Sequence, residues 1–512
     1  MKKYLLLILL GFTTSVVHSQ DITDALRFAQ VNLKGTARFS AMGGAFGALG
    51  GDFSSLNVNP AGSAIFNNNQ IALTFNSFGI KNNSSYFGTI TSEKNSSSDL
   101  NEFGAVYVLK NLDKKSYWKK FSFALNYENA NNFDDAIFSA GTNTSHSVGD
   151  YFKYYANQNE GQSVSNLQLQ PGETITSLYD YLGANYGYGA QQAFLGYQGF
   201  IIDPANNYNE VSNRNYVSLV PTGGNYYQEN YSRSNGYNGK LSFNTSAQYK
   251  DKLYFGANIN SHFVDFSQNN SFYEENSNNL LSGVQRLRFE NELTTYGNGI
   301  SFQLGTIAKI TKQARIGISY ESSTWYSMND KLTQRLAVIS ANILGELPTD
   351  YVNPSITNIY APYQLQTPGK WTGSFAYIFG KKGVISIDYS TKDYSNTKFN
   401  PSNDFKNANS EIRNLLGQSG ELRIGGEYRI KELSLRAGYR TEQSPYKNGS
   451  TIGNLTGFST GFGYNFGESK LDFTYSHLVR DSQKQFFSAG MTDSATINSI
   501  SNSLTMTLSF EL

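Results

Sequence analysis

The sequence predicts an all-β protein that crosses a membrane as a closed, antiparallel, transmembrane β-barrel. Three observations carry this prediction. They are an N-terminal secretory signal, the lack of any later apolar run of the roughly 18 to 20 residues that a membrane helix needs, and an alternating C-terminal strand. A mean hydropathy of −0.43 with 14% aromatic residues is also unlike a helical membrane protein. Any membrane-spanning segments are therefore expected to be strands.

Residues 1–19 have the parts of a signal peptide. Two lysines precede an apolar core from Leu5 to Phe12, and small residues lead to an expected cut after Ser19. Removal of this segment leaves 39 basic against 40 acidic side chains, because the two lysines leave with it. The mature chain lacks the excess of Lys and Arg that nucleic-acid binding requires, so no nucleic-acid partner is expected.

The C-terminus gives the strongest local signal for a strand. Apolar and polar residues alternate up to the last position, with the apolar set formed by Leu504, Met506, Leu508, Phe510 and Leu512. A soluble sheet has the same period of two, but soluble chains usually fray at their ends. The pattern resembles the terminal strand that outer-membrane assembly machinery reads, although Leu512 stands where Phe is usual. This machinery is an expected partner.

Similar alternation recurs in pairs separated by short, mostly charged turns. Leu241–Tyr249 and Leu253–Ile259, for example, flank a turn at residues 250–252 and predict a hairpin. With the other pairs we expect about fourteen strands, and an even number keeps both termini in the periplasm. Closure is required because hydrocarbon offers no hydrogen-bond partners to an open sheet edge.

About fourteen strands of roughly 9 to 11 residues occupy only about 140 residues, so loops are expected to be large. The longest interruption, about 128–238, predicts an extracellular loop with two short helices over the barrel mouth. Its apolar residues are candidates for a capture groove, although loop residues of this kind more often pack the loop itself: Ile175, Leu178, Leu182 and Phe194. A further loop helix is expected from Ser410 to Gly417.

Residues 35–62 read GTARFSAMGGAFGALGGDFSSLNVNPAG and precede the first strand. No Lys-Ser or Lys-Thr pair follows these glycines and no strand precedes them, which argues against a nucleotide-binding loop. Small side chains and free backbone dihedrals instead allow a compact plug inside a narrow lumen, with a flexible leader as the alternative. The expected organisation is a signal peptide (1–19), a hatch or plug (20–68) and the barrel (69–512).

This segment, which ends in Asn59-Pro60-Ala61-Gly62, resembles the N-terminal hatch of the long-chain fatty-acid and aromatic-hydrocarbon outer-membrane transporter family (FadL/TodX type). Two later segments are more weakly similar to the same family: ELRIGGEYRIKELSLRAGYR from Glu421 and GFGYNFGESKLDFTYSH from Gly461. The resemblance implies a monomeric barrel in the bacterial outer membrane, a hatch inside its lumen, and passive transport of long-chain fatty acids or similar hydrophobic molecules. Sideways exit into lipid would avoid re-solvating the chain at about 0.8 kcal/mol per CH₂.

The resemblance also suggests candidate residues for the ligand site. It implies that the hatch borders the ligand at Asn59, Pro60, Ala61 and Gly62, whereas the alternative is an ordinary Asn-Pro turn. Arg27 or Arg38 is a candidate partner for a carboxylate head group. Either arginine is equally able to bind the lumen wall instead.

No enzyme is expected. Residues 457–461 match the G-x-S-x-G pattern by letter but lie in an alternating strand rather than at a strand-to-helix turn. The histidines outside the signal are isolated, and the chain has no cysteine, so no metal site or cofactor is expected. The alternative to transport is a barrel that serves as a scaffold in secretion or surface-protein attachment.

Overall fold

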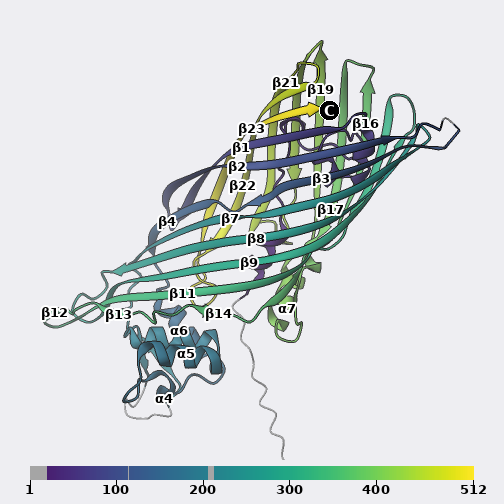
Figure 1. The fold of residues 1–512 in the computed structure, drawn as a ribbon. Coiled ribbons are helices and arrows are strands. Elements are labelled where there is room, and N and C mark those ends of the chain that lie inside the picture. The colour runs from purple at the N-terminus through teal and green to yellow at the C-terminus, as the bar shows by residue number, and fades with distance from the viewer. Residues whose placement is uncertain (1–19, 114, 206–212) are drawn as a thin grey trace, which may run out of the picture.

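The computed structural model describes residues 20–113, 115–205 and 213–512, so the predicted signal peptide lies outside the described residues. Within them, fourteen antiparallel strands form one closed barrel (Figure 1), which confirms the predicted fold class and strand number. Four wall strands are interrupted and carry two labels each. The strands in wall order are β1 (Gln70–Tyr86), β2 (Thr89–Lys110), β3 (Trp118–Asn132) continued by β4 (Asp135–Asn143), β7 (Tyr226–Tyr249), β8 (Leu253–Asn276), β9 (Gly283–Lys309), β10 (Ala314–Glu321) continued by β11 (Trp325–Asn342), β16 (Lys370–Phe379) preceded by β15 (Tyr363–Gln366), β17 (Gly383–Asp393) followed by β18 (Lys398–Asn400), β19 (Gln418–Ile430), β20 (Leu433–Glu442), β21 (Ile452–Asn465), β22 (Ser469–Gln485) and β23 (Ser494–Glu511).

The first and last strands close the barrel. Their register runs from Gln70 opposite Glu511 to Ser85 opposite Thr496 without a shift. In hydrocarbon an unpaired backbone group costs several kcal/mol, and this ladder pairs the edges that the first and last strands would otherwise expose. The alternating C-terminal residues thus supply both the lipid-facing side chains and the closing partner of β1.

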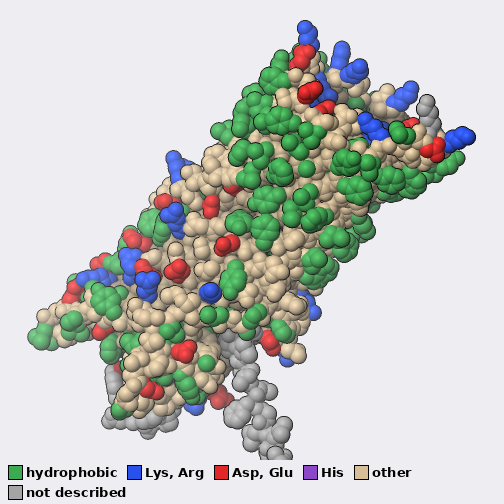
Figure 2. Space-filling model, in the orientation of Figure 1, with side chains coloured by type: hydrophobic (Ala, Val, Ile, Leu, Met, Phe, Trp, Pro, Cys, Tyr) green, Lys and Arg blue, Asp and Glu red, His purple; other side chains and the backbone are tan. Residues whose placement is uncertain are grey.

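Apolar side chains form a band on the outside of the wall. In Figure 2 they gather around the half of the barrel that carries the C-terminus, whereas the other half is mostly polar. Phe243, Ile259 and Ile300 lie in this band and are 56%, 61% and 56% exposed. Because β7, β8 and β9 have 24, 24 and 27 residues, they continue well beyond the band. The wall therefore rises above the lipid on the extracellular side.

Helices occupy two places, the lumen and the extracellular end. The lumen holds α1 (Ile22–Ala29), α2 (Ala37–Ala41) and the 3-10 helices η1 (Ser54–Asn57) and η2 (Pro60–Ile65). The extracellular end carries α3 (Gly149–Asn157), α4 (Val164–Leu167), α5 (Ile175–Tyr186), α6 (Tyr188–Gln198), η3 (Tyr394–Asn396), α7 (Lys406–Leu415) and the short strands β5 (Ile202–Pro204), β6 (Tyr216–Ser218), β12 (Gly345–Glu346), β13 (Asp350–Val352) and β14 (Asn358–Ile359). Across the described residues, every helix is too short or too polar to cross a membrane.

Two expected boundaries differ from the structure. The longest connection spans residues 144–225 rather than 128–238, because wall strands above the lipid continue to pair without apolar alternation. Helix α7 begins at Lys406 rather than after Ser410. Its start is fixed by the buried Phe405, whose ring stacks on Phe399 at 5.2 Å, a tertiary contact that the local sequence does not reveal.

The closing register makes a direct prediction. Ala72 and Ser509 are opposite one another on β1 and β23, and the chain has no native cysteine. Ala72→Cys/Ser509→Cys is expected to form a disulfide, because opposite positions of an antiparallel pair have Cα atoms about 4.5–5.5 Å apart. The measurement is a faster-migrating denatured band on a non-reducing gel.

The control for this experiment is Ala72→Cys/Ser501→Cys. Ser501 pairs with Ile80, eight positions from Ala72, so this variant is expected to stay reduced. Equal cross-linking of the two variants would contradict the closing register.

Candidate functional site

The segment from residues 20 to 68, named the hatch here, lies inside the barrel. Nearly all of its residues from Gly35 onward are buried, and η2 packs against β7, β8 and β9 while α2 packs against β20, β21 and β22. Two wall glycines permit this close contact. A Cβ at Gly256 would lie 2.3 Å from the carbonyl carbon of Pro60, and one at Gly438 would lie 2.2 Å from the backbone nitrogen of Gly43.

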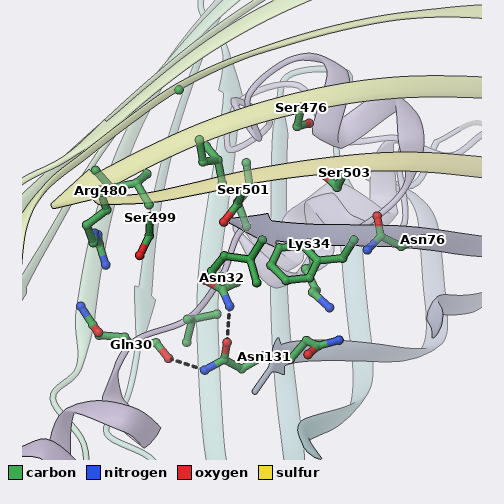
Figure 3. Close-up of a pocket in the computed structure, with 18 of the residues that line it drawn as sticks. Gln30, Asn32, Lys34, Asn76, Asn131, Ser476, Arg480, Ser499, Ser501 and Ser503 are labelled. Atoms are coloured by element: carbon green, nitrogen blue, oxygen red, sulfur yellow. Dashed lines mark hydrogen bonds between the residues drawn. The ribbon is translucent and has the colours of Figure 1, made fainter. Parts of the chain in front are cut away.

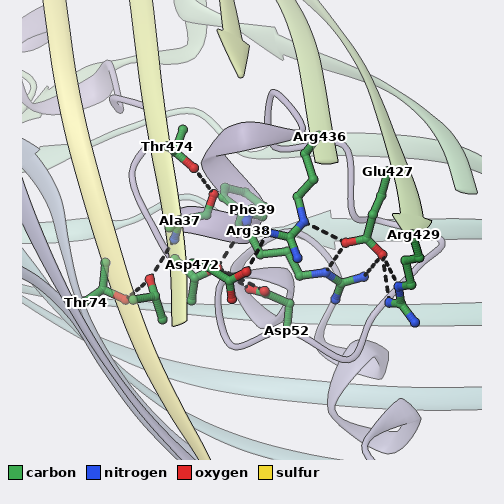
Figure 4. A network of polar contacts seen from close by, with 12 residues as sticks. Ala37, Arg38, Phe39, Asp52, Thr74, Glu427, Arg429, Arg436, Asp472 and Thr474 are labelled. Carbon is green, nitrogen blue, oxygen red and sulfur yellow. Dashed lines mark hydrogen bonds and ion pairs between the residues drawn. The ribbon is translucent and has the colours of Figure 1, made fainter. Parts of the chain in front are cut away.

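A network of charges ties α2 to the wall (Figure 4). Arg38 Nε lies 2.9 Å from Glu427 Oε2, and the same carboxylate is 2.7 Å from both Arg429 Nη2 and Arg436 Nε. Arg436 continues the network to Asp472 at 2.5 Å. Burial alone would lower the pKa of Arg38, but Glu427 and Asp52 together raise it above its ordinary value. Arg38 is therefore a fixed positive charge that holds the hatch against β19.

Two further contacts hold the middle and the end of the hatch. The Asp388 carboxylate accepts hydrogen bonds from the backbone N–H groups of Phe46 and Gly47, each at 3.0 Å from Oδ2. Asn59 Nδ2 donates to the carbonyl oxygens of Gly47 at 2.8 Å and Thr306 at 3.1 Å. Asn59 thus joins two parts of the hatch to β9.

The structure brings the predicted hatch residues together, but as a contact with the wall. Asn59 Oδ1 caps η2 by accepting from the Ala61 N–H at 3.1 Å, and Pro60, Ala61 and Gly62 are buried beside β7 and β8. They do not line either of the lumen cavities described next. Their predicted role at the ligand stays a prediction.

On the extracellular side of the hatch the lumen contains a cavity of about 370 Å³. Its floor is the connection between α1 and α2, and its walls come from β1, β21, β22, β23 and the junction of β3 with β4 (Figure 3). A smaller cavity of about 110 Å³ continues past Asn32 and Lys34 toward β10, β16 and β19. Burial lowers the pKa of Lys34, and the nearby Asp99 carboxylate opposes that shift.

The two candidate arginines have different positions. Arg27 lines the larger cavity, where its guanidinium carbon lies 4.2 Å from the centre of the Phe266 ring and Nη1 lies 2.5 Å from Asp24. Arg38 contacts the wall through Glu427, as the alternative expectation had it. Both guanidiniums already have carboxylate partners.

The wall beside the cavity is broken between β2 and β3. Their backbone ladder ends at the pair Glu102 and Glu128, although both strands continue. Beyond that point side chains replace the ladder. Asn129 Nδ2 donates to Asp99 at 2.7 Å, and Asn132 Nδ2 donates to the same carboxylate at 3.2 Å.

After this break the third wall strand turns into the lumen as β4. Asn82 of β1, which faces inward, donates to the carbonyl oxygen of Ala136 at 2.8 Å, and the hydroxyls of Ser84 and Ser139 lie 2.7 Å apart. β4 keeps its pairing with β7. The wall is therefore continuous on one side of this strand and interrupted on the other, where the cavity lies.

The expected capture-groove residues lie in the extracellular cap, residues 144–225. Leu178, Leu182 and Phe194 are 5%, 0% and 0% exposed, and Ile175 packs against the same cluster. In this structure they form the core of the cap rather than an open groove. The cap is joined to the wall by a buried network in which Tyr179 donates to Gln334 at 2.7 Å.

Sequence reasoning missed the polar residues that line the cavity. Ser499, Ser501 and Ser503 alternate on β23, a pattern that was visible as the polar face of a strand but carried no sign of a cavity. Among the described residues there is no cluster of three or more His, Cys, Asp or Glu side chains suited to a metal ion.

The sequence model described as "Outer membrane protein transport protein (OMPP1/FadL/TodX)" matches residues 224–510, more than half of the chain. The chain belongs to this family. It is an outer-membrane protein of the FadL/TodX type, a family of channels for hydrophobic compounds rather than enzymes. A model of an uncharacterised protein family also matches residues 13–97. A search of curated proteins finds no match.

Two solved structures illustrate the shared fold. A FadL homologue from Pseudomonas aeruginosa superposes with a TM-score of 0.54 and 11% identity, covering 94% of this chain and 99% of its own. The toluene transporter TodX of P. putida superposes with a TM-score of 0.50 and 16% identity, with the same coverages. At these identities the likeness shows the fold alone.

The Arg38 contact makes a testable prediction about the hatch. Arg38→Ala removes a hydrogen-bonded ion pair whose carboxylate is 1% exposed, and it is expected to lower the free energy of local hatch opening by about 2 kcal/mol. Hydrogen exchange at the amides of residues 36–51 should then be about 30-fold faster.

The matched control is Arg429→Ala, which removes a contact to the same carboxylate from a side chain that is 50% exposed. Arg429 belongs to the wall, and exposed pairs contribute under about 1 kcal/mol, so exchange in the hatch should change less than about fivefold. A control effect as large as that of Arg38→Ala would show that the anchor has been assigned wrongly.

Proposed function

We propose that this chain carries hydrophobic small molecules, long-chain amphiphiles among them, passively across the outer membrane. The hatch acts as the gate, and the molecule leaves sideways through the wall. The observation that carries the proposal is the meeting of three features: the cavity, its floor formed by residues 30–34 of the hatch, and the break between β2 and β3.

The break lies at a suitable depth for lateral exit. On β2, Phe103 in the last paired part and Leu100 just beyond it are 40% and 41% exposed on the outside, so the break begins within the apolar band. A molecule that passes between the strands here enters lipid without crossing water, and its apolar surface stays buried at about 25 cal/mol per Å². The same path through an open aqueous pore would lose that contribution.

The hatch contacts both edges of the break, which supports its role as the gate. Lys34 pairs with Asp99 of β2 at 3.2 Å, and Asn32 hydrogen-bonds to Asn131 of β3. A shift of this part of the hatch would release both strands at once. All of these parts come from one chain, so the proposal requires only a monomer.

A barrel that serves only as a scaffold for secretion or surface attachment would need neither the cavity nor the break. No feature of the described residues favours that alternative over transport.

Closing the break should stop transport. Ser97 on β2 and Asn132 on β3 are in hydrogen-bond contact at 3.1 Å across it. Ser97→Cys/Asn132→Cys, joined by a short reducible cross-linker, is expected to lower uptake of a labelled long-chain amphiphile at least about tenfold. Reductant should restore uptake. The assay uses a Gram-negative strain without its own transporter of this type.

The control is the cross-linked Ala72→Cys/Ser509→Cys variant, which joins two strands where the ladder is already intact. Its uptake should equal that of the unmodified chain. Unchanged uptake by the cross-linked Ser97/Asn132 variant would refute lateral exit at this position. No uptake by the unmodified chain of any hydrophobic molecule would refute the transport proposal itself.

A further inference from the structure

Polar side chains outnumber apolar ones among the residues that line the cavity above the hatch. Of its 34 lining residues, ten are apolar, seven are charged and fifteen carry a neutral hydroxyl or amide group. Sites for hydrophobic ligands are usually lined predominantly by apolar side chains. A pure hydrocarbon here would strip water from these polar groups without replacing their hydrogen bonds, which opposes binding.

Serine hydroxyls form a row along one wall of the cavity (Figure 3). Ser499, Ser501 and Ser503 occupy alternate positions of β23, so they point to the same face at intervals of about 7 Å. Ser476 of β22 is directly opposite Ser503. Ser499 donates to Asn82, whereas the hydroxyls of Ser476, Ser501 and Ser503 make no hydrogen bond to any described residue.

Other buried polar atoms around the same cavity are also without partners. Gln30 Nε2, Asn101 Oδ1 and Arg480 Nε make no hydrogen bond to any described residue. Buried polar groups in native proteins are nearly always hydrogen-bonded, and each exception requires an explanation. Together with the serines, they offer both donors and acceptors to whatever occupies the cavity.

Apolar side chains lie next to the hydroxyl row. Phe78 and Ile80 of β1 are the cross-strand partners of Ser503 and Ser501, and Val31 of the hatch lines the same space. The cavity thus combines apolar surface with hydroxyls at regular spacing. This combination suits a molecule that has both an apolar part and several hydrogen-bonding groups.

The charges of the cavity favour a neutral head group. Arg27 and Lys34 pair with Asp24 and Asp99, as described above, and Arg440 Nε lies 2.7 Å from Glu421. Arg480 Nη2 lies 3.4 Å from Glu442. Every cation that lines the cavity therefore already has a carboxylate within 4 Å. At Arg27, Lys34 and Arg440 a carboxylate or phosphate ligand would have to compete with a carboxylate that is already bound, and at Arg480 the nearby Glu442 carboxylate would repel it.

From these observations we infer that the cavity receives an amphiphile whose polar end is neutral and carries several hydroxyls, such as a polyol or sugar ester. Its hydroxyls contact Ser476, Ser501 and Ser503, and its apolar part lies along Phe78 and Val31. This inference rests on the proposed transport function and specifies the class of molecule that the same site accepts.

The test compares three probes that share an eighteen-carbon chain: 1-monooleoylglycerol, oleate and 1-octadecene. Binding is measured by native mass spectrometry or calorimetry on the full chain in a polyoxyethylene detergent, because sugar detergents would compete. The unmodified protein is expected to bind monooleoylglycerol at least about tenfold tighter than either other probe. Ser501→Ala/Ser503→Ala should weaken the binding of monooleoylglycerol about tenfold. It should leave the binding of octadecene as tight as in the unmodified protein, or make it tighter.

The matched control is Ser434→Ala/Ser509→Ala. Ser509 lies on β23 with the same orientation, but both of these serines line a separate cavity on the periplasmic side of the hatch. This variant should bind all three probes as the unmodified protein does. It also shows whether removing two lumen hydroxyls disturbs the barrel in general.

The possible outcomes distinguish the neutral-head inference from the transport proposal. Tighter binding of oleate or octadecene than of monooleoylglycerol overturns the neutral-head inference and leaves the transport proposal intact. Equal loss of monooleoylglycerol binding in the test and control variants also overturns it. Failure of all three probes to bind counts against the transport proposal itself.

Discussion

The closed backbone ladder is the constraint on which the rest of the molecule depends. Within lipid every wall N–H and C=O must find a partner in a neighbouring strand, and the pairing of β1 with β23 completes that ring. A passage through such a wall is possible only where other groups replace the ladder. The structure has such a place between β2 and β3, where Asn129, Asn132 and Asp99 take over the hydrogen bonding.

The paired strands of the wall also hold the hatch in place. One end of the hatch packs through η2 on β7, β8 and β9, and α2 is held to β19 by Arg38 on the other side of the lumen. The part between α1 and α2 contacts both edges of the break through Asn32 and Lys34.

The two faces of the wall are in contact with different environments, lipid on the outside and the lumen on the inside. Lipid selects apolar residues on the outside, whereas the lumen side combines polar and apolar residues, as at Ser501 and Ser503 beside Phe78 and Ile80. The family model covers residues 224–510, which include the closing strand β23 but neither β1 nor the hatch.

The sequence by itself determined the barrel, because outward alternation from Leu504 to Leu512 reports burial in lipid residue by residue. Through their resemblance to a known family, Asn59 to Gly62 also predicted a hatch in the lumen. Only the tertiary structure decided which contacts those residues make. Arg38 and Glu427 form an ion pair although they are 389 positions apart in the sequence. The sequence did not show whether Phe194 faces a ligand or a hydrophobic core, whereas the structure places it in the core of the cap. These contacts depend on how the closed barrel brings distant strands together, and a local sequence pattern contains no information about that arrangement.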